Sequence, residues 1–295
     1  MTAEKSLPEA YARKLISIVS RDRGGRGVSK LSRPDDWQAA AAAFAPLRKV
    51  AVVSGFYIPG AGAPETDGPG GAVMLARAFL REGRGSEVWT DELCLDVMKG
   101  AAAAAGYPER LVKVAPERPD DDPPEGVIFT ERLGRAEDGG YYNFRKADIT
   151  KWTPPLDELA IAAGERGIPT LGIGDGGNEV GMGNFYEELK KLLPAYASCL
   201  CTVRTDYALA VDVSNWGAYA MTAALSFMWG SWRGPEAGEE LAMLEAMKEL
   251  GAVDGISRLP DITVDGFDII LQDRIISSLN ELWRLYSFDR GPSSS

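Results

Sequence analysis

The stretch "IPTLGIGDGGNEVGMGNF", residues 168–185, indicates how this chain folds. Its first part, 168–174, is a short apolar run typical of a buried strand, and a helix is predicted over 183–193. Between them, many glycines surround three side chains that offer oxygen atoms, those of Asp175, Asn178 and Glu179. A strand that leads through such a loop into a helix is one unit of a parallel α/β sheet, with ligands bound at its carboxyl end.

The same alternation extends outward from this stretch. Short β-branched runs alternate with alanine-rich helical stretches, which predicts an α/β fold of three layers, with a mostly parallel, Rossmann-like sheet and flanking helices. The predicted strands are 49–55, 86–90, 110–115, 126–130, 168–174, 199–203 and 207–213. The predicted helices between them are 71–83, 92–105, 154–166 and 183–193.

Three regions follow from the composition along the chain. They are an N-terminal helical segment (1–47), an α/β metal-site domain that includes the C-terminal helices (48–290) and a disordered tail (291–295). The helical stretch "NWGAYAMTAALSFMWGSW" is apolar on nearly every side, so we expect it to be buried in the fold or in a subunit interface. Its tryptophans favour a homo-oligomer.

The overall composition excludes several classes of partner. Among 295 residues, 43 Asp and Glu outnumber 32 Lys and Arg, which gives a net charge of −11. Binding to nucleic acid or to an anionic membrane needs clustered cations, so neither partner is expected. No apolar run is long enough for a membrane span and the N-terminus does not resemble a signal peptide, so a cytoplasmic location is predicted. The three cysteines are expected to be buried thiols.

The chain contains no histidine. Catalytic Ser-His-Asp and Cys-His arrangements and zinc sites of the H-E-x-x-H type are therefore excluded. Acid and base chemistry is left to Asp, Glu, Lys, Tyr or Cys, and a metal would need oxygen ligands. Such ligands suit a divalent cation, Mg²⁺ or Mn²⁺, or else Ca²⁺.

Acidic residues follow four of the predicted strands, where a parallel sheet binds its ligands. Carboxylates that converge there repel one another unless a cation neutralises them, although such residues can also simply cap helices. The residues in question are Glu65, Asp67, Asp91, Glu131 and Asp175. The predicted metal ligands are Asp175, Asn178, Glu179, Asp91 and Glu131.

The loop also contains the spacing G-x-G-x-x-G at Gly172, Gly174 and Gly177. Dinucleotide binding is not expected, because Asp175 lies where a pyrophosphate would approach and no acid follows at the distance needed for a ribose. We therefore predict no nucleotide cofactor.

A second glycine-rich loop, "SGFYIPGAGAPETDGPGGA", leads into a helix whose first N–H groups, near Gly70 and Gly71, could bind an anion. Arg132, Arg145 and the basic loop "RDRGGRG" are further candidates to hold an anionic group. The expected ligand is a small anionic metabolite, either an amino acid or a phosphate ester.

Four motifs carry a resemblance to a known family. In order, "VVSGFYIPGAGAPETDGPGGA", "TERLGRAEDGGYYNFRKADIT", "GIGDGGNEVGMGNF" and "VSNWGAYAM" resemble the C-terminal domain of D-glutamate cyclase and its stand-alone relatives, over about 15–285. The resemblance implies an enzyme that cyclises D-glutamate to 5-oxo-D-proline with loss of water. It also implies a Rossmann-like domain similar to metal-dependent phosphoesterases, with acidic metal ligands.

Roles for individual residues follow from that chemistry. Glu65 or Asp67 would be the catalytic base, Arg132 would hold the α-carboxylate of the substrate, and Asn215 of the fourth motif would help to bind it. Two alternatives remain open at this point: a phosphohydrolase dependent on a divalent metal, and a domain that binds a metabolite or a metal without catalysis.

Overall fold

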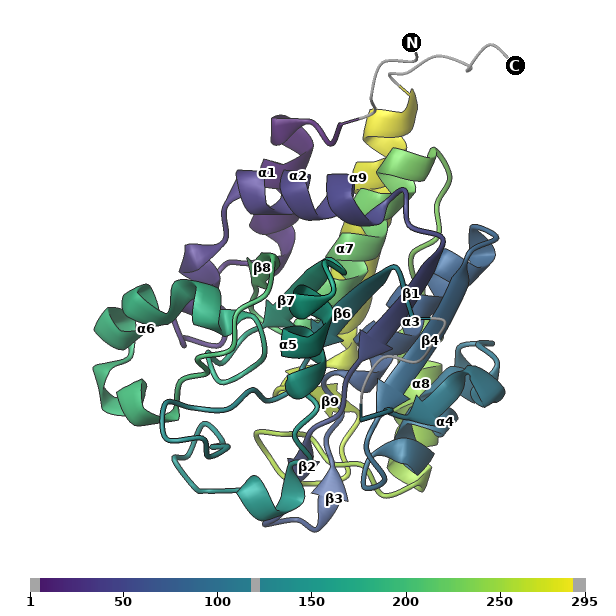
Figure 1. The fold of residues 1–295 in the computed structure, drawn as a ribbon. Coiled ribbons are helices and arrows are strands. Elements are labelled where there is room, and N and C mark those ends of the chain that lie inside the picture. Colours follow the sequence, from purple (N-terminus) through teal and green to yellow (C-terminus); the bar gives the residue numbers. More distant parts are fainter. Residues whose placement is uncertain (1–5, 118–122, 289–295) are drawn as a thin grey trace.

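The computed structural model describes residues 6–117 and 123–288 (Figure 1). Its centre is a six-stranded sheet with the spatial order β5-β4-β1-β6-β7-β8, and all neighbouring strands in it are parallel. The strands are β1 (Lys49–Val53), β4 (Gly85–Thr90), β5 (Val112–Val114), β6 (Gly126–Thr130), β7 (Thr170–Gly174) and β8 (Tyr207–Ala210). The predicted tail, 291–295, lies outside the described residues.

This strand order places β1 and β6 side by side at the middle of the sheet. From β1 the chain first builds the sheet in one direction, through β4 and β5, and then crosses back to build it in the other, from β6 to β8. Ligands of doubly wound sheets bind at such a switch point, beyond the carboxyl ends of the two strands. The fold therefore singles out the segments that follow β1 and β6.

Helices cover both faces of the sheet, which confirms the predicted three-layer α/β arrangement (Figure 1). One face packs against α1 (Glu9–Val19), α2 (Pro34–Phe44), α3 (Pro69–Arg81), α4 (Leu95–Ala104), α7 (Ser214–Trp229), α8 (Glu239–Glu249) and α9 (Ile269–Phe288). The other packs against α5 (Glu158–Glu165), α6 (Tyr186–Leu192) and the 3-10 helices η1 (Val28–Leu31) and η4 (Met182–Phe185).

Alternate side chains of each strand point to opposite faces of the sheet. In β1, Val50 and Val52 join the core beneath the larger helical layer, whereas Ala51 and Val53 join the core on the other side. Helices α1, α2 and α9 lie side by side at the top of Figure 1 and belong to the first of these cores, so the N-terminal helices share their packing with the rest of the fold.

Shorter elements complete the chain. Two antiparallel hairpins pair β2 (Tyr57–Ile58) with β3 (Ala63–Pro64), and β9 (Thr263–Val264) with β10 (Phe267–Asp268). The remaining 3-10 helices are η2 (Glu109–Leu111), η3 (Thr150–Trp152) and η5 (Pro194–Cys199). The hairpins lie below the sheet in Figure 1, on the side of its carboxyl ends, and they frame the site described below.

The strand predicted at 199–203 is wrong. This segment has the composition of a strand, but its backbone pairs with the glycine-rich loop instead of a strand of the sheet: the N–H of Cys201 donates to the carbonyl of Gly177 at 2.9 Å, and that of Gly181 donates to the carbonyl of Val203 at 3.0 Å. The loop itself packs directly on β7, since a Cβ atom on Gly172 would lie 2.6 Å from Cα of Gly181. Only glycines allow this close approach.

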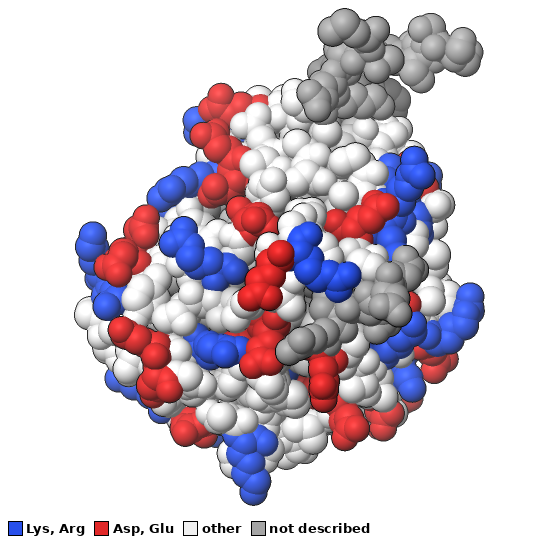
Figure 2. Space-filling view, viewed as in Figure 1, with Lys and Arg blue, Asp and Glu red and all other residues white. Residues whose placement is uncertain are grey.

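The apolar helix predicted after residue 215 is α7, and it is buried within the fold. It packs against α3 on one side and α9 on the other. The three cysteines are free and buried, as predicted. Acidic and basic side chains are interspersed over the face shown in Figure 2. Among the described residues, no helix combines the length and the apolar character needed to cross a bilayer.

Candidate active site

Three carboxylates meet beyond the switch point of the sheet. Asp67 comes from the loop after β1, Glu131 directly follows β6 and Asp175 directly follows β7. Each offers an oxygen atom, and these three oxygens lie within 4.8 Å of one another. All three residues are buried, with exposed fractions of 1%, 7% and 3%. The expected convergence of strand-end acids is therefore present for these three residues.

The first residue of α7 contacts all three carboxylates. The backbone N–H of Ser214 donates to Oδ2 of Asp67 at 3.0 Å and to Oδ2 of Asp175 at 3.2 Å. Its hydroxyl donates to Oε2 of Glu131 at 2.7 Å. The N-terminus of a helix carries a partial positive charge, so this long helix stabilises negative charge on the cluster. Ser214 was not among the predicted site residues, because nothing in the sequence shows where α7 begins relative to the other loops.

Two further acids lie next to the cluster, Glu65 from the end of β3 and Asp265 from the β9–β10 turn. Asp265 and Gly266 are the two central residues of that turn and both have positive φ, 52° and 77°. This is the backbone that a two-residue Asp-Gly hairpin turn adopts. Asp265 was not among the predicted site residues. The Asp-Gly pair does signal a turn, but not that the turn docks against the sheet edge.

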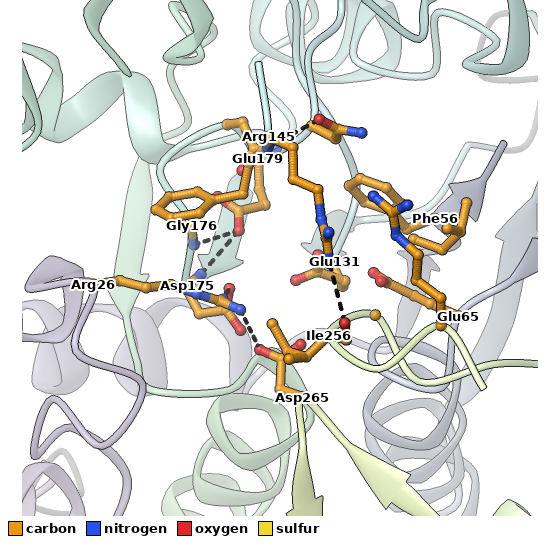
Figure 3. A pocket seen from close by; sticks show the side chains of 16 residues that line it. Arg26, Phe56, Glu65, Glu131, Arg145, Asp175, Gly176, Glu179, Ile256 and Asp265 are labelled. Atoms are coloured by element: carbon orange, nitrogen blue, oxygen red, sulfur yellow. Dashed lines mark hydrogen bonds and ion pairs between the residues drawn. The ribbon is translucent and has the colours of Figure 1, made fainter. Parts of the chain in front are cut away.

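Arg26 is the cation that pairs with acids of the site. Its guanidinium forms ion pairs with Asp175 and, at 2.8 Å, with Asp265, and it stacks over the ring of Phe144 at 5.3 Å (Figure 3). The basic loop that carries Arg26 was a candidate for binding a ligand anion. In the structure Arg26 instead neutralises two carboxylates of the protein itself.

The loop around Arg26 is held in place by Asp212. The buried carboxylate of Asp212 accepts hydrogen bonds from the backbone N–H groups of Arg21 and Asp22, at 2.9 and 2.7 Å. It also forms an ion pair with Arg23 at 2.8 Å. These bonds fix the path of the chain into Arg26, so its guanidinium is positioned by the loop and not only by its own ion pairs.

The buried acids resist ionisation. Burial raises the pKa of the carboxyls of Glu65, Glu131 and Asp175 well above their usual values, and neighbouring carboxylates raise them further. Burial likewise raises the pKa of Asp67 to about 7, and it raises that of Asp265. Among the described residues, the ion pairs to these five acids come from the guanidinium of Arg26. Such a cluster must hold protons or a cation.

The donor set fits a hard cation. All the candidate ligand atoms of Asp67, Glu131 and Asp175 are carboxylate oxygens, which Mg²⁺, Mn²⁺ and Ca²⁺ prefer. Glu131 also adopts a left-handed backbone conformation, with φ of 44°. This conformation is costly for a residue other than glycine and is concentrated at functional sites. Glu131 adopts this conformation directly after β6, where its carboxylate lies close to those of the other two acids.

A cavity of about 120 Å³ opens above these acids. Glu65, Glu131, Asp175 and Asp265 form its floor, as Figure 3 shows. Its walls are apolar, and its mouth carries two arginines; the wall and mouth residues are Phe56, Ile58, Phe144, Ile256, Arg145 and Arg258. The volume is well below the roughly 300–1,000 Å³ of pockets for drug-sized ligands, so the cavity suits a small metabolite.

Glu179 and Asn178 also line the cavity, but their side chains hold the loop. The carboxylate of Glu179 accepts hydrogen bonds from the backbone N–H groups of three loop residues, at 3.1, 2.6 and 2.7 Å: Asp175, Gly176 and Gly177. The amide of Asn178 donates to the carbonyl of Tyr142 at 2.8 Å. In this arrangement the two residues shape the loop that presents Asp175, a role different from the metal ligation predicted for them.

The structure pairs Asp91 with Arg132, outside the cavity lining. The guanidinium of Arg132 also donates to the carbonyls of Gly55, at 2.8 Å, and Pro154, at 2.6 Å, and the residue is 1% exposed. From the sequence, we predicted that Asp91 binds a metal and that Arg132 binds the substrate. Because each is buried against the other, we assign both to positioning the loops after β1 and β4.

Gly70 and Gly71 serve helix packing. A Cβ atom on Gly71 would lie 2.9 Å from Cβ of Ala218, so glycine lets α3 approach α7 closely. The N–H of Gly71 donates to Oδ1 of Asn215 at 2.7 Å and is therefore not available to a ligand. Asn215 is fully buried between the two helices. The structure thus gives Gly71 and Asn215 a packing role, and the anion-binding role expected of Gly70, Gly71 and Asn215 stays a prediction.

Comparison with known proteins identifies the family of this chain. The family described as D-glutamate cyclase-like, C-terminal, matches residues 15–280. The human protein named D-glutamate cyclase, mitochondrial, is 33% identical over 243 residues, which is 74% of this chain and 39% of that protein. The chain thus spans about two fifths of the length of this relative. The match includes every residue of the carboxylate cluster, and the chain belongs to the D-glutamate cyclase-like C-terminal family.

Proposed function

We propose that this chain is an enzyme that cyclises D-glutamate to 5-oxo-D-proline with the help of a divalent metal. The convergence of Asp67, Glu131 and Asp175 at the switch point of the sheet carries this proposal, because it supplies a buried anionic centre at the place where such sheets bind ligands. The family match and the name of the human relative support the choice of substrate.

The reaction forms one bond and breaks another. The α-nitrogen attacks the γ-carboxyl carbon, and one γ-oxygen leaves as water. The ammonium group loses two protons in the process, and the departing oxygen takes up both, so atoms and charge balance. The enzyme must therefore activate a carboxylate carbon that is otherwise unreactive, and it must carry protons from nitrogen to oxygen.

Asp67, Glu131 and Asp175 would hold the metal. A divalent cation bound there supplies a Lewis acid that polarises the γ-carboxyl group. Glu65 lines the cavity, and burial raises the pKa of its carboxyl well above the usual value, which favours the protonated form. A carboxyl group in this state can give a proton to the departing oxygen and then accept one from the nitrogen. We assign the proton transfers to Glu65.

The acidic floor also orients the substrate. An ammonium group is attracted to a cavity bordered by the carboxylates of Glu131 and Asp265, whereas an unneutralised carboxylate is repelled. The Arg26 ion pairs keep Asp175 and Asp265 in place without adding a free positive charge to the floor. The nitrogen of the substrate is thus directed inward.

Turnover of the two enantiomers of glutamate tests the proposal. Purified chain with Mn²⁺ or Mg²⁺ should form 5-oxoproline from D-glutamate and not from L-glutamate, as measured by chiral chromatography. Glu65→Gln and Asp175→Asn should each lower the rate by about 10²-fold or more, since each removes a proton carrier or a ligand. Asp96→Asn, at an exposed position of α4, is the control. Absence of product with metal present, or metal-dependent phosphate release from a phosphate ester instead, would contradict the assignment.

A further inference from the structure

The mouth of the cavity carries a guanidinium that the protein does not use. Arg258 lies in the segment before β9 and lines the cavity. Among the described residues its guanidinium has no hydrogen-bond or ion-pair partner, in contrast to Arg26 and Arg132, which are both committed to carboxylates of the protein.

The backbone at Arg258 is fixed even though its side chain is free. The carboxylate of Asp254 accepts hydrogen bonds from the N–H groups of Ile256 and Ser257 at 2.8 Å each, and the N–H of Arg258 donates to the carbonyl of Asp254 at 2.8 Å. Arg258 has a φ of 59°, which is strained for a residue with a side chain. The loop therefore holds Arg258 at the cavity in an unfavourable backbone conformation. This conformation does not lead to an ion pair with another described residue.

A second arginine faces the same opening. Arg145, which comes from the segment between β6 and α5, donates one hydrogen bond of 3.0 Å to the carbonyl of Ile256, as Figure 3 shows. A guanidinium has five N–H donors, so most of its donors remain available. The contact to Ile256 brings it to the loop that carries Arg258.

The two ends of the cavity thus have opposite charge. The floor consists of carboxylates, and the mouth consists of the two arginines, with Phe56 and Ile58 on the wall between them. A guanidinium binds a carboxylate or a phosphate through paired hydrogen bonds. A small ligand with a positive or metal-bound end and an anionic end can satisfy both ends of the cavity in only one orientation.

We propose that Arg258 and Arg145 bind the anionic group of the substrate that does not react, and so set both its orientation and the requirement for that anion. This inference rests on the proposed function, in which the unreacted anion is the α-carboxylate of D-glutamate. Binding of the α-carboxylate, which was predicted for Arg132 from the sequence, is thus assigned to Arg258 and Arg145. The same pair would recognise the phosphate group of an ester.

Calorimetric binding with Mn²⁺ present tests the pair. The probes are D-glutamate, 4-aminobutyrate, which lacks the α-carboxylate, and glycerol 3-phosphate. The variants are Arg258→Gln and Arg145→Gln, with Arg110→Gln, an exposed arginine remote from the cavity lining, as the matched control. The thermal midpoint of each variant shows that it is folded.

Wild-type protein should bind D-glutamate about tenfold or more tightly than 4-aminobutyrate, since a charged hydrogen bond is at stake. Arg258→Gln should weaken D-glutamate binding by a similar factor and leave 4-aminobutyrate unchanged, and Arg110→Gln should change neither. If D-glutamate is turned over with the same KM in Arg258→Gln, the pair is overturned while the proposed function stands.

The experiment can also show that the arginine pair binds an anion while the proposed cyclisation is wrong. If D-glutamate is neither bound nor turned over, but glycerol 3-phosphate binds and Arg258→Gln weakens it, the anion pair is supported and the proposed cyclisation fails. Wild-type protein that binds neither anion would overturn the pair.

Discussion

The backbone N–H of Asn215 donates a hydrogen bond of 2.8 Å to Oδ1 of Asp67, so the N-terminus of α7 holds a carboxylate that lies 148 residues earlier in the chain. In return, Oδ1 of Asn215 accepts hydrogen bonds from the N–H groups of Gly68 and Gly71, at 2.9 and 2.7 Å. These bonds join the loop after β1 to α7 and determine where Asp67 stands relative to the other acids.

Substitution of Asn215 tests this connection. Asn215→Ala leaves the N–H of Gly71 without an acceptor, which costs about 1–3 kcal/mol, whereas the N–H of Gly68 keeps a bond of 3.0 Å to Oδ1 of Asp67. The free energy of unfolding in urea should therefore fall by about 1–3 kcal/mol. Metal affinity should fall with it, because the loop that carries Asp67 loses its side-chain bonds to α7. A loss below about 0.5 kcal/mol, typical of surface substitutions, would show that these bonds do not hold the loop.

Glu131→Gln should have opposite effects on the metal-free and metal-loaded protein. The raised pKa of Glu131 means that the native state prefers the protonated form, so its contribution to stability is lost as pH rises through that pKa. Glutamine mimics the neutral form and can still accept the hydrogen bond from Ser214. At pH 8 with a chelator the variant should melt at a higher temperature than wild type, whereas millimolar Mn²⁺ should stabilise it less. Equal stabilisation of both proteins by Mn²⁺ would argue against Glu131 as a ligand.

Glu240, a buried acid outside the carboxylate cluster, should make stability depend on pH. Burial raises its pKa to about 7, against a usual value of 4.5, and the hydroxyl of Tyr219 donates to it. Because the folded pKa is the higher one, stability should fall between about pH 4.5 and 7 by an amount on the order of 3 kcal/mol. Glu240→Gln should remove this fall, making the variant more stable than wild type at pH 8 and similar to it at pH 4.5.

Urea unfolding at several pH values, with chelator in every sample, measures this difference. Glu245→Gln, on the exposed side of the same helix, should follow the wild-type profile. Parallel profiles for wild type and Glu240→Gln would contradict the prediction.

Arg26→Gln should make the protein more dependent on metal. Removing one partner of a buried ion pair costs about 3–5 kcal/mol, and here Asp175 and Asp265 both lose their cation. The thermal midpoint in chelator should fall clearly, and the rise on adding Mn²⁺ should exceed that of wild type. Arg13→Gln is the control, since the pair of Arg13 with Glu9 is exposed and should contribute less than about 1 kcal/mol. A variant as stable as this control would show that Arg26 does not balance the cluster.

The sequence predicted the sheet and the core of the site because both depend on local patterns. Short apolar runs marked six of the seven predicted strands correctly, and the residues after them include Asp67, Glu131 and Asp175. Parallel strands bring such positions to one edge whatever the details of packing. The segment 199–203 misled the prediction because its composition is that of a strand, whereas its backbone partners are set by the loop at 177–181.

The sequence did not predict which distant segments pack against the edge of the sheet. Asp265 and Arg26 enter the site only because a hairpin and an N-terminal loop pack against the sheet edge. Arg132 and Arg258 carry the same side chain, but one pairs with a buried acid and the other faces the cavity, and no spacing in the sequence distinguishes them. Glu179 likewise follows a strand closely, yet its carboxylate turns back onto the loop backbone.

Anomalous diffraction from crystals soaked in Mn²⁺ tests the central claim most directly, because it locates the ion by element. We predict one strong anomalous peak, from an Mn²⁺ ion coordinated by Asp67, Glu131 and Asp175. The peak should be absent from Asp175→Asn crystals soaked in the same way. A cluster without anomalous density at millimolar Mn²⁺, or a peak bound by other residues, would contradict it.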